Sequence, residues 1–241
     1  MTYCVGLLLQ EGMVLLSDTR TNAGVDNIAT YRKMFTFEDP GERVIVIMTA
    51  GSLSVTQTAI ARLREAAESP EGEGADSILR ANSMLAVAEI VGRTLSDVSA
   101  EITDKMNRMK QAATASMIVA GQRRGGAMRM FLVYPEGNFI EAIEDTPYLQ
   151  IGEHKYGKPI LDRVVTPATS LVDGQKAVLL SMDSTLRSNL SVGMPLDLAV
   201  IRRDDCRVSD RRRIEAGDPQ FAQMSEAWSD ALRDGFTRIR I

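Results

Sequence analysis

A threonine, an aspartate and a lysine near the start of the chain have the residue types of one nucleophilic site. The sequence opens Met1-Thr2-Tyr3, and Asp18 and Lys33 follow beside early apolar segments. Initiator methionine is normally removed before a small residue, so we expect the mature chain to start at Thr2. A threonine with a free α-amine carries a nucleophile and a base on one residue, because the hydroxyl attacks and the amine takes its proton.

The lysine and the aspartate would tune that base. A free α-amine has a pKa of about 8, and a nearby lysine ammonium lowers it and favours the neutral amine. Asp18 could hold Lys33 beside Thr2, because pairing makes the burial of both charges tolerable. Taken singly, Thr2 is a strand start, Asp18 a turn residue and Lys33 a solvated strand entry. Taken together with the order of elements below, they indicate a catalytic site.

The composition disfavours several other classes of site. His154 is the one histidine of 241 residues, so no Ser-His-Asp triad or His-rich metal site is expected unless His154 takes part. Cys4 and Cys206 share no motif spacing, which favours a reducing compartment. We expect Cys4 to be a buried structural residue. We expect no metal and no cofactor.

Charge and hydropathy favour an ordinary soluble protein. The hydrophobic fraction is 44% and the charged fraction 25%. A net charge of −4 argues weakly against a dedicated nucleic-acid surface. The Arg211–Arg213 run is more typical of a solvated strand face or a subunit contact than of a phosphate site. No apolar run approaches a membrane span or a signal peptide, so we expect a cytoplasmic protein with no membrane partner.

Apolar runs predict strands in three parts of the chain. The predicted strands are 3–9, 12–18, 33–37 and 43–50, then 115–121, 129–134 and 139–142, and finally 196–202 and 207–214.

Helical spacing of apolar residues predicts helices between and after these strands. The first follows a capping box at Ser54 to Gln57, and the second is capped by Asp76 and runs to about Met109. The others cover 156–165, 173–190 and a C-terminal segment at 219–237.

The order of elements predicts an α+β fold with four layers. Strands, two helices, strands, two helices, strands and a last helix suit two sheets packed face to face with a helical layer on each outer side, an αββα sandwich. No linker or internal repeat divides the chain, so we expect a single domain over 1–241.

With these features the whole chain resembles the proteasome β-type subunits and HslV, which are N-terminal-nucleophile hydrolases, and above all the bacterial proteasome-like group called Anbu. The resemblance implies a nucleophile at Thr2, with Asp18 and Lys33 as its catalytic partners, although the Thr2-to-Lys33 gap is one residue shorter than the usual proteasome pattern. It also implies that the Gly51 N–H, in the run Thr49-Ala50-Gly51, forms the oxyanion hole.

Later segments carry the resemblance further. The turn Gly152 to Pro159, the stretch Ser188 to Gly193 and the run Thr21 to Gly24 are similar to Anbu sequences. Glu153 stands where proteasomes and HslV carry a serine that supports the N-terminal amine. Asp183 is similar to an aspartate at a helix end of HslV, which implies that Asp183 contacts Thr2.

The resemblance implies a threonine-type peptidase that acts on a peptide or polypeptide. Arg20, Thr49 and Leu53 would line the specificity pocket, and their mixed character indicates no preference. Self-association into a ring, or into an open helical ring-like assembly, is implied as well. Two alternatives stay open, namely a proteasome-fold scaffold with little activity and a hydrolase of small amides. The sequence does not identify an unfoldase partner.

Overall fold

The chain start lies in an antiparallel five-stranded sheet with the order β10-β1-β2-β11-β12. The computed structural model describes residues 2–22, 28–70, 76–106 and 113–240. The strands of this sheet are β1 Tyr3–Leu9, β2 Gly12–Asp18, β10 Tyr148–Gly152, β11 Leu196–Arg202 and β12 Asp210–Ile214. β2 is buried at every position because other layers cover both of its faces, which explains its continuous apolar run.

The second sheet is also antiparallel and five-stranded, with the order β5-β6-β7-β8-β9. Its strands are β5 Met34–Asp39, β6 Arg43–Gly51, β7 Ala115–Arg123, β8 Arg129–Val133 and β9 Phe139–Glu141. A separate pair, β3 Arg20–Asn22 and β4 Ile28–Thr30, forms a small two-stranded sheet between β2 and β5 in the chain.

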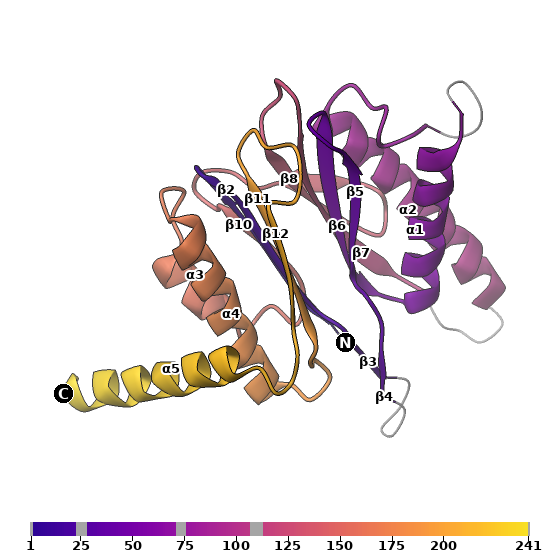
Figure 1. Ribbon diagram of the computed structural model, residues 1–241. Helices are drawn as coiled ribbons and strands as arrows, with labels where there is room; N and C mark the ends of the chain where they lie inside the picture. Colours follow the sequence, from indigo (N-terminus) through magenta and orange to yellow (C-terminus); the bar gives the residue numbers. More distant parts are fainter. Residues whose placement is uncertain (1, 23–27, 71–75, 107–112, 241) are drawn as a thin grey trace.

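Helices cover the outer face of each sheet (Figure 1). On the second sheet lie α1 Leu53–Glu68 and α2 Met84–Met106. On the first sheet lie α3 Lys158–Val164 and α4 Leu171–Ser188. The last helix, α5 Pro219–Arg238, starts beside α4 and projects away from the body of the molecule.

Three apolar cores hold the layers together, one at each boundary. Between the sheets, Leu15 and Met13 of β2 meet Met48 of β6 and Met130 of β8. The other two cores fill the space between each sheet and its helices. A stack with three internal boundaries has four layers, and the expected αββα sandwich is therefore confirmed.

Two predicted helix starts are wrong. α1 begins at Leu53 with Ser52 as its N-cap, and that cap makes no side-chain hydrogen bond, so the expected capping box at Ser54 does not form. α2 begins at Met84, where the Ser83 hydroxyl accepts the Ala86 N–H at 3.0 Å. Asp76 lies upstream of that helix and pairs with Arg93 instead. The expected helical position Met109 lies outside the described residues.

The predicted strands miss β3, β4 and β10. Two others start later than expected, at Met34 for β5 and Asp210 for β12. β10 matters most for the site, because it pairs with β1 and sets Gly152 opposite Tyr3. Within the described ranges, no helix has the length and apolar character needed to cross a membrane.

Candidate active site

The strand registers gather the expected site residues at one end of the sandwich. Tyr3 pairs with Gly152, and Asp18 pairs with Leu196, so the beginning of β1 and the end of β2 lie at the same end of the first sheet. Lys33 comes from the segment just before β5 in the second sheet. Strand pairing within the first sheet brings Tyr3 beside Asp18, and the packing of the two sheets brings Lys33 beside Asp18, each across fifteen residues of sequence.

Asp18 lies at the centre of this end of the sandwich. Its side chain is fully buried, and its carboxylate accepts hydrogen bonds from the Lys33 ammonium at 2.8 Å, the Tyr3 N–H at 3.1 Å and the Gly193 N–H at 3.2 Å. A buried carboxylate needs such donors, because an isolated buried charge is strongly unfavourable. The Tyr3 contact ties Asp18 directly to the residue that follows Thr2.

Hydrogen bonds fix both the side chain and the backbone of Lys33. The ammonium donates to Asp18 and also to the Arg20 carbonyl at 2.5 Å, while the Lys33 carbonyl accepts the Thr49 N–H at 2.9 Å. Only 5% of the residue is exposed. The structure thus brings Asp18 and Lys33 together as the sequence suggested.

The electrostatics of Asp18 reflect opposing effects. Burial raises the pKa of the Asp18 carboxyl above its usual value, and the Lys33 ammonium and the N–H donors of Tyr3 and Gly193 oppose that rise. The ion pair keeps a proton-binding group and a cation in contact where water is excluded. In such a site, the Coulomb interaction between the pair and a neighbouring titratable group is stronger than it would be for a solvated pair.

Backbone contacts fix Thr2 just before β1, at one end of the first sheet. It is 7% exposed, and its carbonyl accepts the Glu153 N–H at 2.7 Å. Gly152 makes this approach possible, because its φ is +81° and a Cβ there would lie 1.9 Å from the Thr2 carbonyl oxygen. The turn after β10 therefore positions Thr2 through glycine and backbone contacts.

Gly51, the expected oxyanion donor, ends β6 at the same end of the sandwich. It is exposed and has a φ of +111°, and a Cβ at this position would lie 2.4 Å from the Thr114 carbonyl oxygen. Glycine is thus required by the local backbone, whatever its role in chemistry.

The geometry matches a known family. A family model described as "Proteasome subunit" matches residues 2–201. The chain belongs to the proteasome family. Two solved structures with its fold are Anbu from Yersinia bercovieri, at 41% identity and a TM-score of 0.91, and Anbu from Hyphomicrobium sp. strain MC1, at 45% and 0.89. Each match covers 100% of this chain and 99% of the other.

A third solved structure is similar over the same length. It is a helical assembly of the Anbu complex from Pseudomonas aeruginosa, at 42% identity and a TM-score of 0.92, covering 100% of this chain and 98% of that one. No match was found among curated proteins. The resemblance to proteasome subunits and to Anbu is therefore confirmed along the chain.

Asp183 occupies a different setting from the one that the proteasome resemblance implied. Its carboxylate accepts the Ser225 hydroxyl at 2.7 Å and pairs with Arg187 at 3.2 Å. Among the described residues, no hydrogen bond joins Asp183 to Thr2. Asp183 therefore anchors the base of α5 to α4, and a contribution to catalysis in this proteasome-family chain stays a prediction.

The three residues that were expected to line the specificity pocket have different surroundings. The Arg20 guanidinium donates to the Leu190 carbonyl at 3.0 Å and lies so close to Gly193 that a Cβ there would be 2.1 Å from Arg20 Nε. Arg20 thus supports the segment that carries the Gly193 N–H to Asp18. Thr49 is buried, and Leu53 is half-buried at the start of α1. Their roles in substrate binding stay predictions.

Cys4 takes no part in this network as a nucleophile. Its thiol is fully buried, 3.8 Å from the Thr49 carbonyl oxygen, and burial raises its pKa far above the usual range. A thiol that cannot ionise is a poor nucleophile, which agrees with a structural role.

Sequence reasoning missed the part played by Tyr3. Its phenol oxygen lies 2.5 Å from the Ser181 hydroxyl of α4 and accepts the Gln150 amide of β10 at 2.6 Å. Gly157 leaves room for this contact, because a Cβ there would lie 2.7 Å from the phenol oxygen. Together with the contact between the Tyr3 N–H and Asp18, these hydrogen bonds join Tyr3 to β2, β10 and α4. The sequence did carry one signal for this role. A tyrosine, whose hydroxyl needs a hydrogen-bond partner when the ring is buried, directly follows the threonine.

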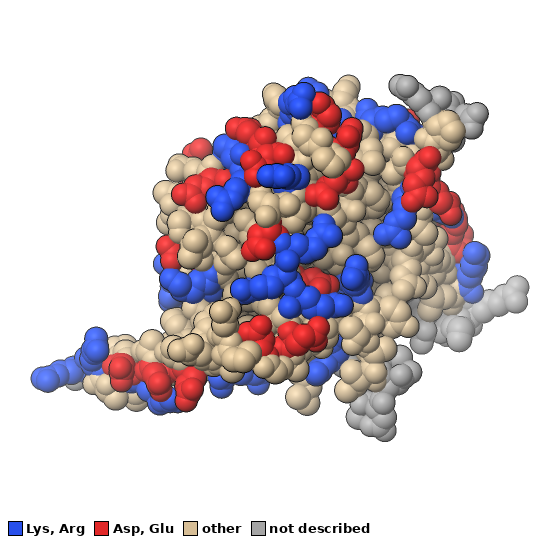
Figure 2. Space-filling model, in the orientation of Figure 1, with Lys and Arg blue, Asp and Glu red and all other residues tan. Residues whose placement is uncertain are grey.

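The arginine run Arg211–Arg213 lies on β12, an edge strand of the first sheet, and faces a cleft that residues of β5 and β11 also line. With Arg32 and Arg64 it lines a cleft that also contains Asp197, which pairs with Arg213 at 3.1 Å. Figure 2 shows Lys and Arg side chains gathered across this face. The run is a strand face, as expected, and not a part of the candidate site.

Proposed function

We propose that this chain is a threonine-type hydrolase subunit that cleaves amide bonds with Thr2 as its nucleophile. The observation that carries the proposal is the buried Asp18–Lys33 ion pair, whose carboxylate also binds the Tyr3 N–H next to Thr2. A buried ion pair is costly in desolvation and is a weak source of stability. Charged groups in such a setting are concentrated at functional sites.

The proposed reaction has two halves. The Thr2 hydroxyl attacks the carbonyl carbon of the scissile amide, and the Thr2 α-amine accepts the hydroxyl proton and passes it to the leaving amine. The Gly51 N–H stabilises the oxyanion. The C–N bond breaks and leaves an ester on Thr2. Water then attacks that ester with the same amine as base, which releases the acid and restores the hydroxyl.

Lys33 and Asp18 act on the base and not on the substrate in this scheme. The Lys33 ammonium disfavours protonation of the nearby Thr2 amine, so the amine stays in its neutral form. Asp18 holds Lys33 in place through their contact at 2.8 Å. Removal of either residue should therefore weaken the base and not the binding of substrate.

We further infer that the substrate is a peptide or polypeptide and that the chain works in a self-associated particle. The support is family membership together with the helical assembly formed by the Anbu relative from Pseudomonas aeruginosa. A scaffold with little activity and a hydrolase of small amides are the competing functions. Release of a chromophore from a set of short peptide amides separates them, with Thr2→Ala as the control.

The expected result is turnover by the wild-type chain and none by Thr2→Ala, Asp18→Ala or Lys33→Ala. The three residues act as one unit, so Thr2→Ala/Lys33→Ala should be no worse than either single change. Equal turnover by Thr2→Ala would assign the activity elsewhere. Cleavage of small amides but no peptides would favour the small-amide function.

A further inference from the structure

The cleft beside β12 is strongly basic, although the chain as a whole is acidic. Its volume is about 500 Å³. Among the described residues that line it, five are arginines and one, Asp197, is acidic, whereas the whole chain has a net charge of −4. Arg32 comes from the segment before β5, Arg64 from α1 and the remaining three from β12. The positive charge is therefore assembled from three segments that are far apart in the sequence.

The Asp197 carboxylate shows that several of these guanidiniums act on the same small space. Arg213 pairs with Asp197 at 3.1 Å. Burial raises the pKa of the Asp197 carboxyl above its usual value, and the guanidiniums of Arg213, Arg32 and Arg211 oppose that rise. Glu215 is a further carboxylate that acts on it, and it adds to the rise. Arginines from two of the three segments therefore lie within electrostatic reach of one side chain.

Three of the five guanidiniums carry charge that no contact compensates. Arg32, Arg64 and Arg211 make no hydrogen bond and no ion pair with any residue that the structure describes. Arginine is effectively always protonated in proteins, so these charges persist at every pH at which the chain is folded. Like charges gathered in a cleft create a local positive potential that attracts anions. The arrangement therefore favours an anionic ligand.

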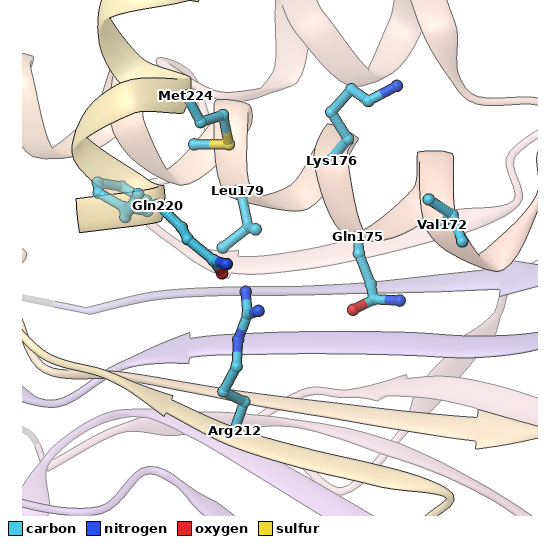
Figure 3. A pocket seen from close by; sticks show the side chains of 8 residues that line it. Val172, Gln175, Lys176, Leu179, Arg212, Gln220 and Met224 are labelled. Atoms are coloured by element: carbon cyan, nitrogen blue, oxygen red, sulfur yellow. The ribbon is translucent and has the colours of Figure 1, made fainter. Parts of the chain in front are cut away.

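Strand alternation separates Arg212 from the other two arginines of β12. Ile214 packs in the core between the first sheet and its helices, so Arg212 lies on that face, and Arg211 and Arg213 lie on the opposite one. Arg212 also borders the cleft, but its guanidinium points into the groove between α4 and α5 (Figure 3). The same strand thus carries one arginine of equal charge that is directed elsewhere.

Protection of sheet edges explains only part of this charge. β5 and β12 are edge strands, and charged side chains on such strands discourage pairing with other chains. Arg64 belongs to α1 and Arg32 precedes β5, so neither is needed for that purpose. Guanidinium forks bind the oxygens of phosphate groups in pairs, and several forks around one concave space suit a ligand with more than one such group.

We propose that this cleft binds a small anion with two or more linked phosphate groups, held by Arg32, Arg64 and Arg211. A cavity of this volume is typical of small-ligand sites. Linked phosphates bring several charges into that volume, so that one ligand reaches guanidiniums from all three segments. Nucleoside triphosphates and inorganic polyphosphate share this chemistry. The inference concerns a surface outside the Thr2 site and does not depend on the proposed hydrolase activity.

Calorimetric titration of the full chain with sodium triphosphate tests the site. We expect saturable binding, and weaker binding of inorganic phosphate because it reaches fewer guanidiniums. Arg211→Gln and Arg64→Gln should each weaken triphosphate binding at least about tenfold, since each removes hydrogen bonds between charged groups. Arg212→Gln removes the same charge from the same strand, and at physiological ionic strength it should change the affinity less than about threefold.

Two results of this titration would overturn the proposal. Equal losses of affinity in Arg211→Gln and Arg212→Gln would mean that triphosphate responds to the charge of the surface and not to a site. Titration of the wild-type chain without saturable binding would remove the site altogether. Thr2→Ala should bind triphosphate as the wild type does, so the result is separate from that of the hydrolase proposal.

A gain of affinity provides a second test. Asp197→Asn keeps the size of the side chain and releases Arg213 from its ion pair, so triphosphate should bind more tightly than it does to the wild type. Weaker or unchanged binding would contradict a competition between Asp197 and the ligand for the same guanidiniums.

The source of the phosphate groups follows from a comparison of ligands. ATP that binds at least as tightly as triphosphate would identify a nucleotide, and weaker binding of ATP would identify a free polyphosphate; both results keep the proposal. A hexaglutamate peptide carries its charges on carboxylates along an extended chain. Tighter binding of hexaglutamate than of triphosphate would overturn the phosphate assignment and make the cleft a site for acidic peptides.

Discussion

The Asp18 carboxylate and the Lys33 ammonium meet at 2.8 Å with 0% and 6% of their side chains exposed. The pair joins the end of β2 to the segment before β5, and through the Tyr3 N–H it reaches the start of β1. Both sheets are therefore locked to each other beside Thr2. The stability of this end of the sandwich and the proposed chemistry depend on the same contact.

Breaking the pair from one side should destabilise the protein strongly. Lys33→Met leaves the Asp18 carboxylate buried without its cation, which typically costs about 3–5 kcal/mol. We expect the free energy of unfolding in urea to fall by about that amount at a fixed protein concentration, while the fold persists and hydrolysis is lost.

The double variant Asp18→Asn/Lys33→Met serves as the control for this prediction. It removes both charges, so its loss of stability should be smaller than the sum of the two single losses. Additive losses would show that the two residues do not act as a pair.

Gly152 should be irreplaceable because of the Thr2 carbonyl and not merely because of its backbone angle. Gly152→Ala places a Cβ 1.9 Å from the Thr2 carbonyl oxygen, so we expect Thr2 to be displaced and hydrolysis to be lost. Gly125 has a similar φ of +70° but nothing within 4 Å of its would-be Cβ. Gly125→Ala should cost about 1–2 kcal/mol of conformational strain and keep full activity. Similar activities in the two variants would contradict the positioning role of Gly152.

Glu153 should tune the base if its carboxylate lies near the Thr2 amine. A carboxylate there favours the ammonium form, so activity would be weak near neutral pH and rise toward alkaline pH. Glu153→Ser should move the acid limb of the pH–rate profile to lower pH and raise turnover near pH 7. Each pH unit by which the limb moves corresponds to about 1.4 kcal/mol of interaction with the ammonium form. Glu144→Ser removes an exposed carboxylate elsewhere and should change neither. An unchanged profile in Glu153→Ser would mean that this side chain pairs elsewhere.

Tyr3 should make the protein sensitive to alkali. Burial raises the pKa of its phenol from 10.0 to about 12. The neutral phenol is therefore favoured in the folded state, and its contribution is complete below the unfolded pKa of 10.0 and is lost as pH rises toward about 12. The full displacement corresponds to about 2.7 kcal/mol.

A pair of tyrosine variants isolates this effect. The free energy of unfolding of Tyr3→Phe should fall less steeply between about pH 10 and about pH 12 than that of wild type. Tyr31→Phe, which removes an exposed phenol, should retain the wild-type slope. Identical slopes in all three proteins would show that Tyr3 does not ionise on unfolding in this range.

The sequence predicts the layers of this fold well because its signals are local. Continuous apolar runs indicated β1, β2 and β6, and helical spacing indicated α4 and α5. Short strands such as β3 and β4 carry too few residues to show a period. The start of α2 was misplaced because Asp76 has the residue type of an N-cap, whereas the backbone geometry selects Ser83.

The candidate site was partly predictable for the same reason. Asp18 and Lys33 stand at strand ends, where their types and spacing are visible in the sequence. The Gly193 N–H and the Tyr3 phenol act through contacts 175 and 178 residues away, and no local pattern reports such pairs. Asp183 shows the opposite problem, because a motif match placed it near Thr2 and its hydrogen bonds place it at α5.

The most direct test of the account is the site of covalent attachment of an electrophilic peptide inhibitor. Mass spectrometry of the purified protein should first show that Met1 has been removed. After treatment, the adduct should reside on Thr2, and it should be absent in Thr2→Ala and strongly reduced in Lys33→Ala. Active protein that retains Met1, or an adduct on Cys4 or any other residue with Thr2 unmodified, would contradict a mechanism based on the amine and hydroxyl of Thr2.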